Sequence, residues 1–571
     1  MNQMTTSRRS FVKGSAALAA GAAAGALVAP AMADEAQVTL NAQNVNLVKW
    51  DFEIPPAPIT DDMIKETVPC EIVIVGAGFS GIVTALAAAE EGAKVTVVTA
   101  SDDIVIRGGS MNARWSKAME ELTVGMKVAD DRQFIREQLA CAGYNVDQKK
   151  WWKFVKYSPE AMNWLIDKME AEGFMTVLER GFDMGGDTFF SSLPGSHSWT
   201  TDDSGKAGKG SQMNVVETVY RDALAAGVEF VFSCPARQLV RDDNNTGRVS
   251  AVIAQNADGD YIKYEASKAI VLATGDFSAN HDMMAKYCPE FLPLIDPPMD
   301  EPDYNVGFKF GGLMPGDGHK MGLWIGAAWQ KTYPCAPMTF AIGTAGPFNQ
   351  PYSGHRGLLL NKYGERYGNE DICGVFAGVA QVHQPEMKVY AIWGANYAEG
   401  AAPWITQGSK IEDAPATPEF MLENWKEGFM IPDPQDVIMS DDLEDLVAQL
   451  GLPVEETMAT IARYNELCEK GVDEDFCKCA EQMVPIAEPP YFGVLGNPPH
   501  FLTVCGGLRT DDKMRVCDAD DNPIPGLYNV GTMIGDYFAN IYNFMIEGNN
   551  LGANCLTFGY LTGRGLAQGT I

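Results

Sequence analysis

Three glycines at fixed spacing form the clearest chemical signal in the sequence. Gly76, Gly78 and Gly81 directly follow the apolar run 71–75, and helix-forming residues continue from them to Gly92. The first glycine permits a tight turn, the second lets the backbone approach a phosphate, and the third lets a helix pack closely on a strand. This spacing predicts a loop that holds a diphosphate at the N-terminus of a helix.

The strand expected after that helix ends without the acid that usually accompanies such a loop. Residues 94–98 form this strand, and Thr99 stands where an Asp or Glu would bind the ribose hydroxyls. Thr99 can make one hydrogen bond, and Ser101 or Asp102 can reach the same place. NAD often depends on the acid for its selection over NADP, whereas FAD is held over a longer surface and tolerates the loss of one contact. The missing acid is therefore compatible with FAD, and the rest of the chain supports that cofactor.

Four further motifs follow the first turn in a fixed order. An apolar strand at 270–277 contains Ala-Thr-Gly, residues 316–319 open a helix, residues 524–531 form a strand and turn, and residues 548–564 lead into a last helix. Together with the first turn, these motifs resemble the flavoprotein family of soluble fumarate reductases, urocanate reductase and 3-ketosteroid Δ1-dehydrogenases. The resemblance covers roughly residues 68–568.

The resemblance implies an α/β fold in which a Rossmann-like FAD-binding domain is split by an α+β capping domain. Substrate would lie between the two domains, against the flavin ring. The expected segments are a signal peptide (1–33), an N-terminal arm on the surface (34–65), the FAD-binding domain (66–332 and 503–571) and the capping domain (333–502).

The resemblance also assigns cofactor contacts by position. Gly108 and Gly109 would approach the flavin, the backbone at Ala236 would meet the adenine, and Asp317 would face the ribityl chain. Backbone N–H groups of residues 550–552 would stabilise the negative charge of reduced flavin at its pyrimidine ring. Thr532, like Thr99, replaces an acid of the family. The predicted cofactor set is Gly76, Gly78, Phe79, Ser80, Gly81, Thr99, Gly108, Gly109, Ser110, Ala236, Thr274, Gly275, Asp317, Gly531, Asn550, Leu551 and Gly552.

The positions that bind a dicarboxylate in fumarate reductases have lost their cationic side chains here. A buried carboxylate without a cation is strongly disfavoured, so we expect the pocket to reject fumarate. Apolar and aromatic residues around these positions suit a larger, more apolar substrate. The two histidines and two arginines of those enzymes are replaced by Ala336, Gly374, Thr503 and Ile546, and the aromatic residues are Phe340, Phe538, Tyr542 and Phe544.

A flavin-dependent C=C reductase also needs a group that protonates the substrate or polarises its carbonyl. In the ketosteroid enzymes tyrosines do this work. Alternatively, Arg356 forms a surface ion pair and His355 is an ordinary loop histidine. The catalytic candidates are Tyr542, Tyr333, His355 and Arg356.

The resemblance therefore predicts an oxidoreductase that reduces the activated C=C bond of a small-molecule alkene, an enoate or enone with an aromatic or polycyclic body. No separate haem-binding or FMN-binding domain is visible, so an external cytochrome or flavoprotein would supply the electrons. The alternative is a 3-ketosteroid Δ1-dehydrogenase-type desaturase. A third alternative, an electron-transfer flavoprotein, would not need a capping domain of this size.

The N-terminus predicts export from the cytoplasm. Paired arginines in the stretch 7–13, SRRSFVK, precede an Ala/Gly-rich run and the small-residue cleavage pattern at 31–33. This pattern resembles a twin-arginine signal, and an alanine-rich helical tail is the alternative. Later segments lack ~20 consecutive apolar residues, so we expect no integral membrane span after signal cleavage. The predicted location is the periplasm or the outer face of the cytoplasmic membrane.

Charge and cysteine content limit the partners further. The net charge of -32 disfavours nucleic acid, because phosphates repel such a surface. The same charge would attract a basic electron carrier such as a cytochrome, or it only keeps the protein soluble. Twelve cysteines show no disulfide framework and no Cys-x-x-Cys-His sequence. Cys468, Cys477 and Cys479 form a loose cluster that would bind metal or iron–sulfur or, as we favour, consists of ordinary thiols.

Overall fold

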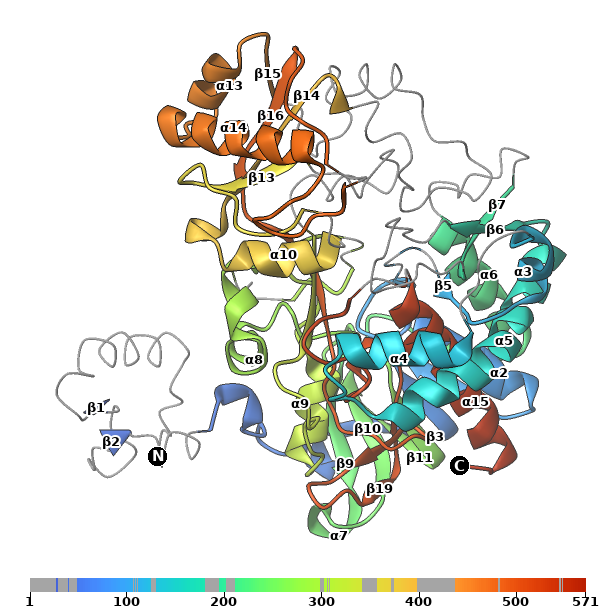
Figure 1. Ribbon diagram of the computed structural model, residues 1–571. Coiled ribbons are helices and arrows are strands. Elements are labelled where there is room, and N and C mark those ends of the chain that lie inside the picture. Colours follow the sequence, from blue (N-terminus) through green and yellow to red (C-terminus); the bar gives the residue numbers. More distant parts are fainter. Residues whose placement is uncertain are drawn as a thin grey trace.

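In the computed structural model, an eight-stranded sheet and a four-stranded sheet occupy different parts of the molecule (Figure 1). The structure describes residues 27–28, 39–40, 49–105, 107, 109, 111–124, 130–179, 195–201, 211–297, 302–305, 307, 309–340, 357–370, 374–397, 437–480, 483–543, 546 and 548–571.

The larger sheet is mainly parallel, as the α/β prediction requires. Its strands run in the order β18, β19, β11, β3, β4, β8, with β10 and β9 attached to β11 in antiparallel pairs. The strands from β19 to β8 are parallel, and β18 is antiparallel to β19. Their bounds are β3 (Ile64–Val75), β4 (Val95–Val98), β8 (Glu229–Val231), β9 (Ala236–Arg241), β10 (Val249–Gln255), β11 (Tyr261–Leu272), β18 (Arg515–Cys517) and β19 (Pro523–Asn529).

Successive side chains of β3 point to opposite faces of this sheet, and both faces are covered. Ile72 and Ile74 pack against a cluster of helices, whereas Val73 and Val75 pack in a second core with residues of the β9–β10 pair and the helix α9. The helices are α2 (Phe79–Glu90), α5 (Gln148–Ala171), α6 (Ser211–Ala225) and α15 (Phe558–Gln568) on the first face and α9 (Asp317–Trp324) on the second.

The predicted strand–turn–helix–strand unit is confirmed as β3, the glycine turn, α2 and β4. The strand before the turn is longer than its apolar run, because β3 begins at Ile64 and pairs with β11 from its first residue. The segment before it is anchored rather than lying wholly on the surface. Phe52 is 5% exposed and packs in a core cluster with Phe277 and Tyr287.

The C-terminal segment returns to the first half of the chain. β19 lies beside β11, and the π-helical segment η9 (Asn550–Thr557) continues directly into α15. α15 packs closely on α2 because its glycines leave room for the other backbone. A Cβ at Gly563 would lie 2.3 Å from the carbonyl oxygen of Thr84.

A separate unit is formed by residues of the predicted capping segment (Figure 1). It contains the four-stranded sheet β13–β14–β16–β15 and two helices that pack on it. The antiparallel pair β12–β17 and the helix α10 lie between this unit and the large sheet. The bounds are β12 (Ala336–Phe340), β13 (Leu358–Asn361), β14 (Val389–Gly394), β15 (Val437–Ser440), β16 (Tyr491–Asn497), β17 (His500–Cys505), α10 (Gly374–Val382), α13 (Leu443–Gln449) and α14 (Val454–Lys470).

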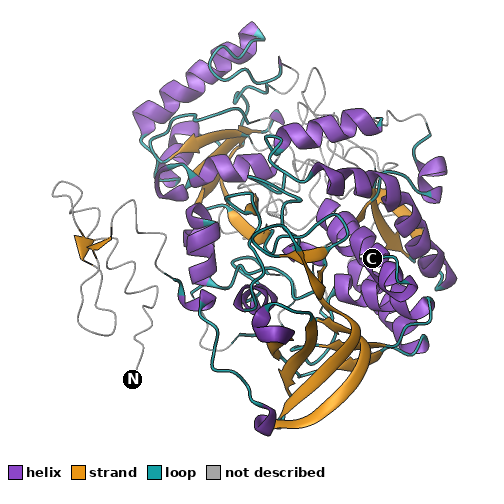
Figure 2. Cartoon of the chain, turned by 90° about the horizontal axis from the view of Figure 1, so that it is seen from below, coloured by secondary structure: helices purple, strands orange, loops and turns teal. Residues whose placement is uncertain are grey.

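Smaller elements complete the described chain. A three-stranded antiparallel sheet lies beside α5, and Figures 1 and 2 both show the short pair β1–β2 apart from the other sheets. These elements are β1 (Leu27–Val28), β2 (Thr39–Leu40), β5 (Met111–Asn112), β6 (Met175–Glu179), β7 (Ser196–Thr200), α3 (Lys117–Leu122), α4 (Asp131–Cys141), α7 (Asp242–Asn245) and α8 (His281–Tyr287). Among the described residues, no helix is long and apolar enough to cross a membrane.

Candidate cofactor cavity and active site

A cavity lies where the parallel strands β3, β4 and β11 reach their carboxyl ends. This is the edge at which open α/β sheets bind ligands. The glycine turn after β3, residues 99–101 after β4 and residues 273–275 after β11 all line it. The predicted cofactor residues on its wall are Gly76, Gly78, Phe79, Ser80, Thr99, Ala236, Thr274, Gly275, Asp317 and Leu551.

The glycines of the turn show that the cavity fits a phosphate-bearing cofactor. A Cβ at Gly76 would lie 2.4 Å from the carbonyl oxygen of Ala273, and one at Gly81 would lie 2.1 Å from that of Gly76. Internal packing therefore explains both glycines. A Cβ at Gly78 would meet no protein atom within 4 Å, although Gly78 lines the cavity and begins α2 without a side-chain cap. A ligand that approaches the backbone at this point accounts for the open space.

Two hydroxyls occupy the place where an acid is expected after β4. Thr99 Oγ1 and Ser101 Oγ lie 2.9 Å apart, both side chains are buried, and both residues line the cavity. Asp102 is exposed and is not on the wall; its N–H donates to Asn305 Oδ1. This end of the cavity therefore offers neutral donors and acceptors instead of a carboxylate.

Asp317 lies at the start of α9 with two partners. Tyr304 Oη donates to Asp317 Oδ2 over 2.7 Å, and Lys320 Nζ lies 2.6 Å from Asp317 Oδ1. Tyr304 itself lines the cavity. Sequence reasoning missed this tyrosine because it belongs to no glycine-rich motif.

A second acid, which is buried, directly follows the wall residue Gly275. Asp276 is 3% exposed and accepts hydrogen bonds from Thr503 Oγ1 at 2.7 Å and Ser278 Oγ at 2.8 Å. Burial raises the pKa of Asp276, whereas these hydrogen bonds and the nearby charge of Arg107 oppose the rise. Arg107 is a wall residue that sequence reasoning also missed.

Tyr542 is buried, and its hydroxyl oxygen accepts a hydrogen bond from the first residue of η9. Asn550 N–H donates to Tyr542 Oη over 3.0 Å, and the ring of Phe538 lies 4.6 Å away, centroid to centroid. Gly552 N–H donates to Gly548 O over 2.8 Å. Two of the three backbone donors predicted to face the flavin therefore have protein acceptors in this structure, and Leu551 alone of the three residues lines the cavity.

The residues predicted to surround the substrate are packed together in one apolar cluster. Ala336, Ile546, Phe538 and Tyr542 all belong to it, and each is at most 4% exposed. Tyr333 lies outside this cluster and is 59% exposed. Of the remaining predicted site residues, Gly81, Gly109, Gly531, Asn550 and Gly552 are described but do not line the cavity, whereas Gly108, Ser110, Phe544, His355, Arg356 and the side chain of Phe340 lie outside the described residues.

His319 is a buried histidine next to this region. Its Nε2 lies 3.2 Å from Gly506 O, its Nδ1 has no partner among the described residues, and its ring packs beside Phe277 and Trp329. Burial lowers the pKa of His319 to about 4, so the imidazole is neutral at pH 7.

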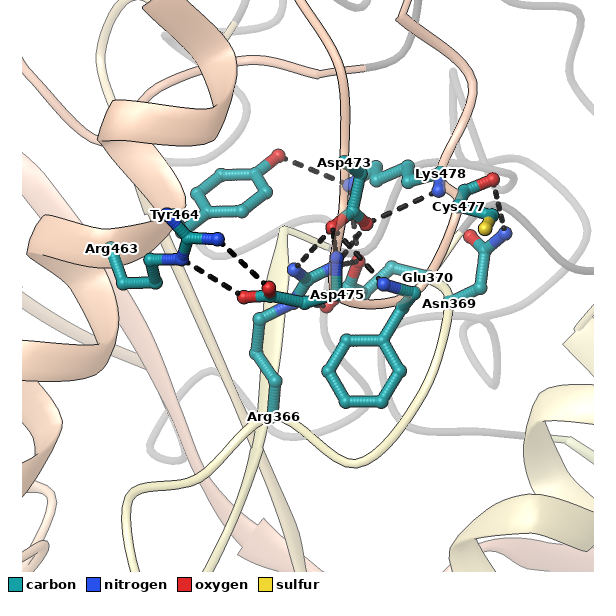
Figure 3. Close-up of polar contacts among 10 residues, drawn as sticks. Arg366, Asn369, Glu370, Arg463, Tyr464, Asp473, Asp475, Cys477 and Lys478 are labelled. Atoms are coloured by element: carbon teal, nitrogen blue, oxygen red, sulfur yellow. Dashed lines mark hydrogen bonds and ion pairs between the residues drawn. The ribbon is translucent and has the colours of Figure 1, made fainter. Parts of the chain in front are cut away.

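The cysteine-containing loop of the capping segment holds buried ion pairs. No group of three or more metal-binding side chains occurs within the described part of the chain. Arg366 makes paired hydrogen bonds to Glu370 (2.9 Å each) and to Asp473 (3.2 and 2.9 Å), as Figure 3 shows. Lys478 lies 3.4 Å from Glu370 Oε2. These side chains are at most 5% exposed, so the loop is fixed to residues 366–370 by buried charges.

Comparison with known proteins places these observations in context. The family described as "FAD binding domain" matches residues 71–551. Vinyl phenol reductase of Lactiplantibacillus plantarum is 24% identical over 86% of this chain and 94% of that protein. Fumarate reductase (cytochrome) of Shewanella frigidimarina is 25% identical over 87% of this chain and 77% of that protein.

The solved structures agree with the fold. The 3-ketosteroid-Δ4-(5α)-dehydrogenase of Rhodococcus jostii superimposes with a TM-score of 0.67 at 21% identity, and the match covers 89% of this chain and 99% of that chain.

Proposed function

The chain belongs to the FAD-binding flavoprotein family that matches residues 71–551, and on that premise we propose that it reduces the activated C=C bond of an aromatic or polycyclic α,β-unsaturated compound. The expected substrate is a monocarboxylate or a neutral molecule. Electrons would come from a separate carrier protein. The runner-up is the reverse reaction, desaturation of a ketosteroid-like substrate, which the match to 3-oxosteroid 1-dehydrogenase of Mycobacterium tuberculosis supports over 55% of each chain.

The observation that carries this proposal is the chemistry at three of the four positions where fumarate reductases have cations; the surroundings of the fourth, Gly374, lie outside the described part of the chain. Ala336 and Ile546 are 0% and 2% exposed within the apolar cluster. Thr503 donates its hydroxyl hydrogen to the carboxylate of Asp276. A dicarboxylate would therefore meet alkyl groups and an acid instead of two or more positive charges, and its desolvation would not be compensated.

An aromatic body is favoured by the surroundings and by one relative. Burial of apolar substrate surface against residues such as Phe538 would contribute roughly 25 cal/mol per Å². The relative that matches nearly its whole length is named for a vinyl phenol, a molecule with an aromatic ring and an alkene. Both arguments point away from small dianions.

The wall residues named above would hold FAD, and reduced FAD would supply a hydride to the alkene. Tyr542 is the residue that we expect to handle the proton. Its oxygen accepts the Asn550 N–H over 3.0 Å, and this N–H would stabilise the phenolate that remains after the hydroxyl hydrogen passes to the substrate. The apolar cluster around it excludes water. Tyr333, exposed at the start of the capping segment, is available to bind the polar end of a substrate.

Stopped-flow reoxidation of photoreduced enzyme tests the proposal. Aromatic enoates, aromatic enones and ketosteroid alkenes should reoxidise the flavin rapidly, and fumarate should not. Tyr542→Phe should slow reoxidation by the best alkene about 10²–10⁴-fold while FAD content and reduction by dithionite stay unchanged. Rapid turnover of fumarate by the wild type would overturn the pocket argument. Ketosteroid oxidation with an artificial acceptor, without alkene reduction, would favour the runner-up.

We also propose that the chain is exported through the twin-arginine route with its cofactor bound. Arg8 and Arg9 followed by Phe11 support this, as does an acidic protein that needs an external, basic electron donor. Replacement of both arginines by lysine should leave precursor in the cytoplasm. Unchanged export of that variant would refute the assignment.

A further inference from the structure

Neutral residues stand at both wall positions where the resembled family has an acid. Thr99 and Thr532 line the cavity, and neither brings a charge. The same wall contains Arg107 and Tyr304, which belong to none of the predicted motifs. Tyr304 donates to the carboxylate of Asp317, and the charge of Asp276 acts on Arg107.

Arg107 is placed close to the phosphate turn. Val105 pairs with Gly78 of the turn, and its N–H donates to Ala77 O over 3.2 Å. Arg107 lies only two residues after Val105 in the chain and is therefore near the turn. Burial lowers the pKa of Arg107, and the charges of Asp276 and Asp303 oppose that decrease. An arginine remains protonated in any protein environment, so the cavity wall carries a permanent positive charge at this point.

Asp276 is a buried acid whose charge acts on Arg107. Besides the hydroxyls of Thr503 and Ser278, its oxygens accept the backbone N–H groups of Ser278 and Met314, each at 3.2 Å. Four donors from three segments hold this carboxylate in one position. The charge of Asp276 therefore acts on Arg107 from a fixed place.

Tyr304 is fixed in a similar way by a different acid. Its hydroxyl donates to Asp317 Oδ2, which leaves the lone pairs of the phenol oxygen available to a ligand. The next residue, Asn305, accepts the N–H of Asp102 over 2.9 Å. Residues 302–305 are thus attached both to α9 and to the segment after β4.

We propose that Arg107 and Tyr304 bind FAD and so replace the contact that an acid after β4 would otherwise make. Arg107 binds the diphosphate, because a guanidinium matches phosphate oxygens in charge and geometry. Tyr304 accepts a hydrogen bond from a sugar hydroxyl of the cofactor, which is the role that the acid has elsewhere. Asp276 and Asp317 are positioning residues for these two groups. The proposal deepens FAD binding and does not depend on which alkene is reduced.

Equilibrium dissociation of FAD from the purified holoprotein tests this inference without any substrate. Free FAD is measured by its fluorescence after dilution and ultrafiltration. Arg107→Gln should raise the Kd for FAD about 10–100-fold, and Arg107→Lys should restore part of the affinity. Tyr304→Phe should raise the Kd about 3–10-fold. Thr99→Ala should change it less than either.

Two matched variants control for general loss of stability. Arg114 is a buried arginine 3.1 Å from Asp131, and Tyr560 donates to Glu160 over 3.1 Å; neither lines the cavity. Arg114→Gln and Tyr560→Phe should leave the Kd for FAD unchanged. The proposal is overturned if Arg107→Gln and Tyr304→Phe bind FAD like the wild type, or if the control variants lose as much affinity. Failure of the alkene assay alone would not contradict this proposal on FAD binding.

Discussion

Gly76 and Gly78 stand two residues apart in one turn, but a side chain would meet different obstacles at each. At Gly76 the backbone has a φ of +115°, and a Cβ would collide with Ala273 O at 2.4 Å. At Gly78 the Cβ would enter open space within the cavity. The first glycine is therefore required by the protein and the second by its ligand.

This difference gives a prediction for a pair of variants. Gly78→Val should fold normally but purify without FAD, because the isopropyl group occupies the place of the diphosphate. Gly76→Val should also lower the free energy of unfolding by at least about 2 kcal/mol through steric strain. The flavin absorbance per chain and the urea midpoint measure the two effects. A yellow Gly78→Val protein would contradict the assignment of the cavity.

The residues of the site that sequence could predict are those whose function requires a local pattern. Gly76, Gly78 and Gly275 lie at strand ends within recognisable motifs. Arg107 and Tyr304 could not be found in this way, because the contacts that define them are made with residues distant in the chain. The charge of Asp276 acts on Arg107, and Tyr304 donates to Asp317; no spacing rule connects such pairs.

At the scale of elements, the loop after α14 shows how charge fixes a segment that has little regular structure. Asp473 accepts hydrogen bonds from Arg366 and from the backbone N–H groups of Asp475, Phe476 and Lys478. These donors lower the pKa of Asp473 to about 2. Asp475, two residues after Asp473, lies at the surface of this loop and pairs with Arg463 of α14 (Figure 3).

The two aspartates provide a matched test of burial. Asp473→Asn should lower the free energy of unfolding by about 3 kcal/mol, because Arg366 stays buried with less compensating charge. Asp475→Asn should cost less than about 1 kcal/mol, since both partners of that ion pair are about one-third or more exposed. Urea denaturation followed by intrinsic fluorescence measures both. Equal losses would show that the buried cluster has no special role.

Elements with strong periodic patterns were predicted well, and elements that depend on tertiary pairing were not. The helix after the glycine turn and the apolar strand that leads to Ala-Thr-Gly appear where expected. The polar first half of β3 has no apolar run to reveal it, and it becomes a strand because β11 supplies a parallel partner. The Pro-rich sequence after Phe52 likewise has no pattern that predicts the packing of this side chain in the core.

Over the whole molecule, two buried histidines predict how stability depends on pH. Burial lowers the pKa of both His197 and His319 to about 4. Above pH ~6.5 each histidine is neutral in the folded and the unfolded chain, so it does not make the free energy of unfolding depend on pH. Between pH ~6.5 and ~4 only the unfolded chain takes up the protons, so the folded state loses up to about 3 kcal/mol for each histidine.

The urea midpoint should therefore fall steadily from pH 7 to pH 4.5. Replacement of His197 by glutamine, whose side-chain amide stays neutral throughout, should make that dependence shallower even if it lowers stability at pH 7. A midpoint that does not change between pH 7 and pH 5 would show that these histidines titrate normally in the folded protein.

The parallel contact between β11 and β19 has a consequence for how the protein is made. The edge of β11 at residues 270–272 is completed only by residues 527–529, and the cavity wall extends to Cys555. A nascent chain on the ribosome therefore carries an unpaired, apolar strand edge for more than two hundred residues of synthesis, which invites aggregation. Cofactor insertion must wait until Cys555 has been synthesised, and a chain that stops before it is a target for chaperones and proteases.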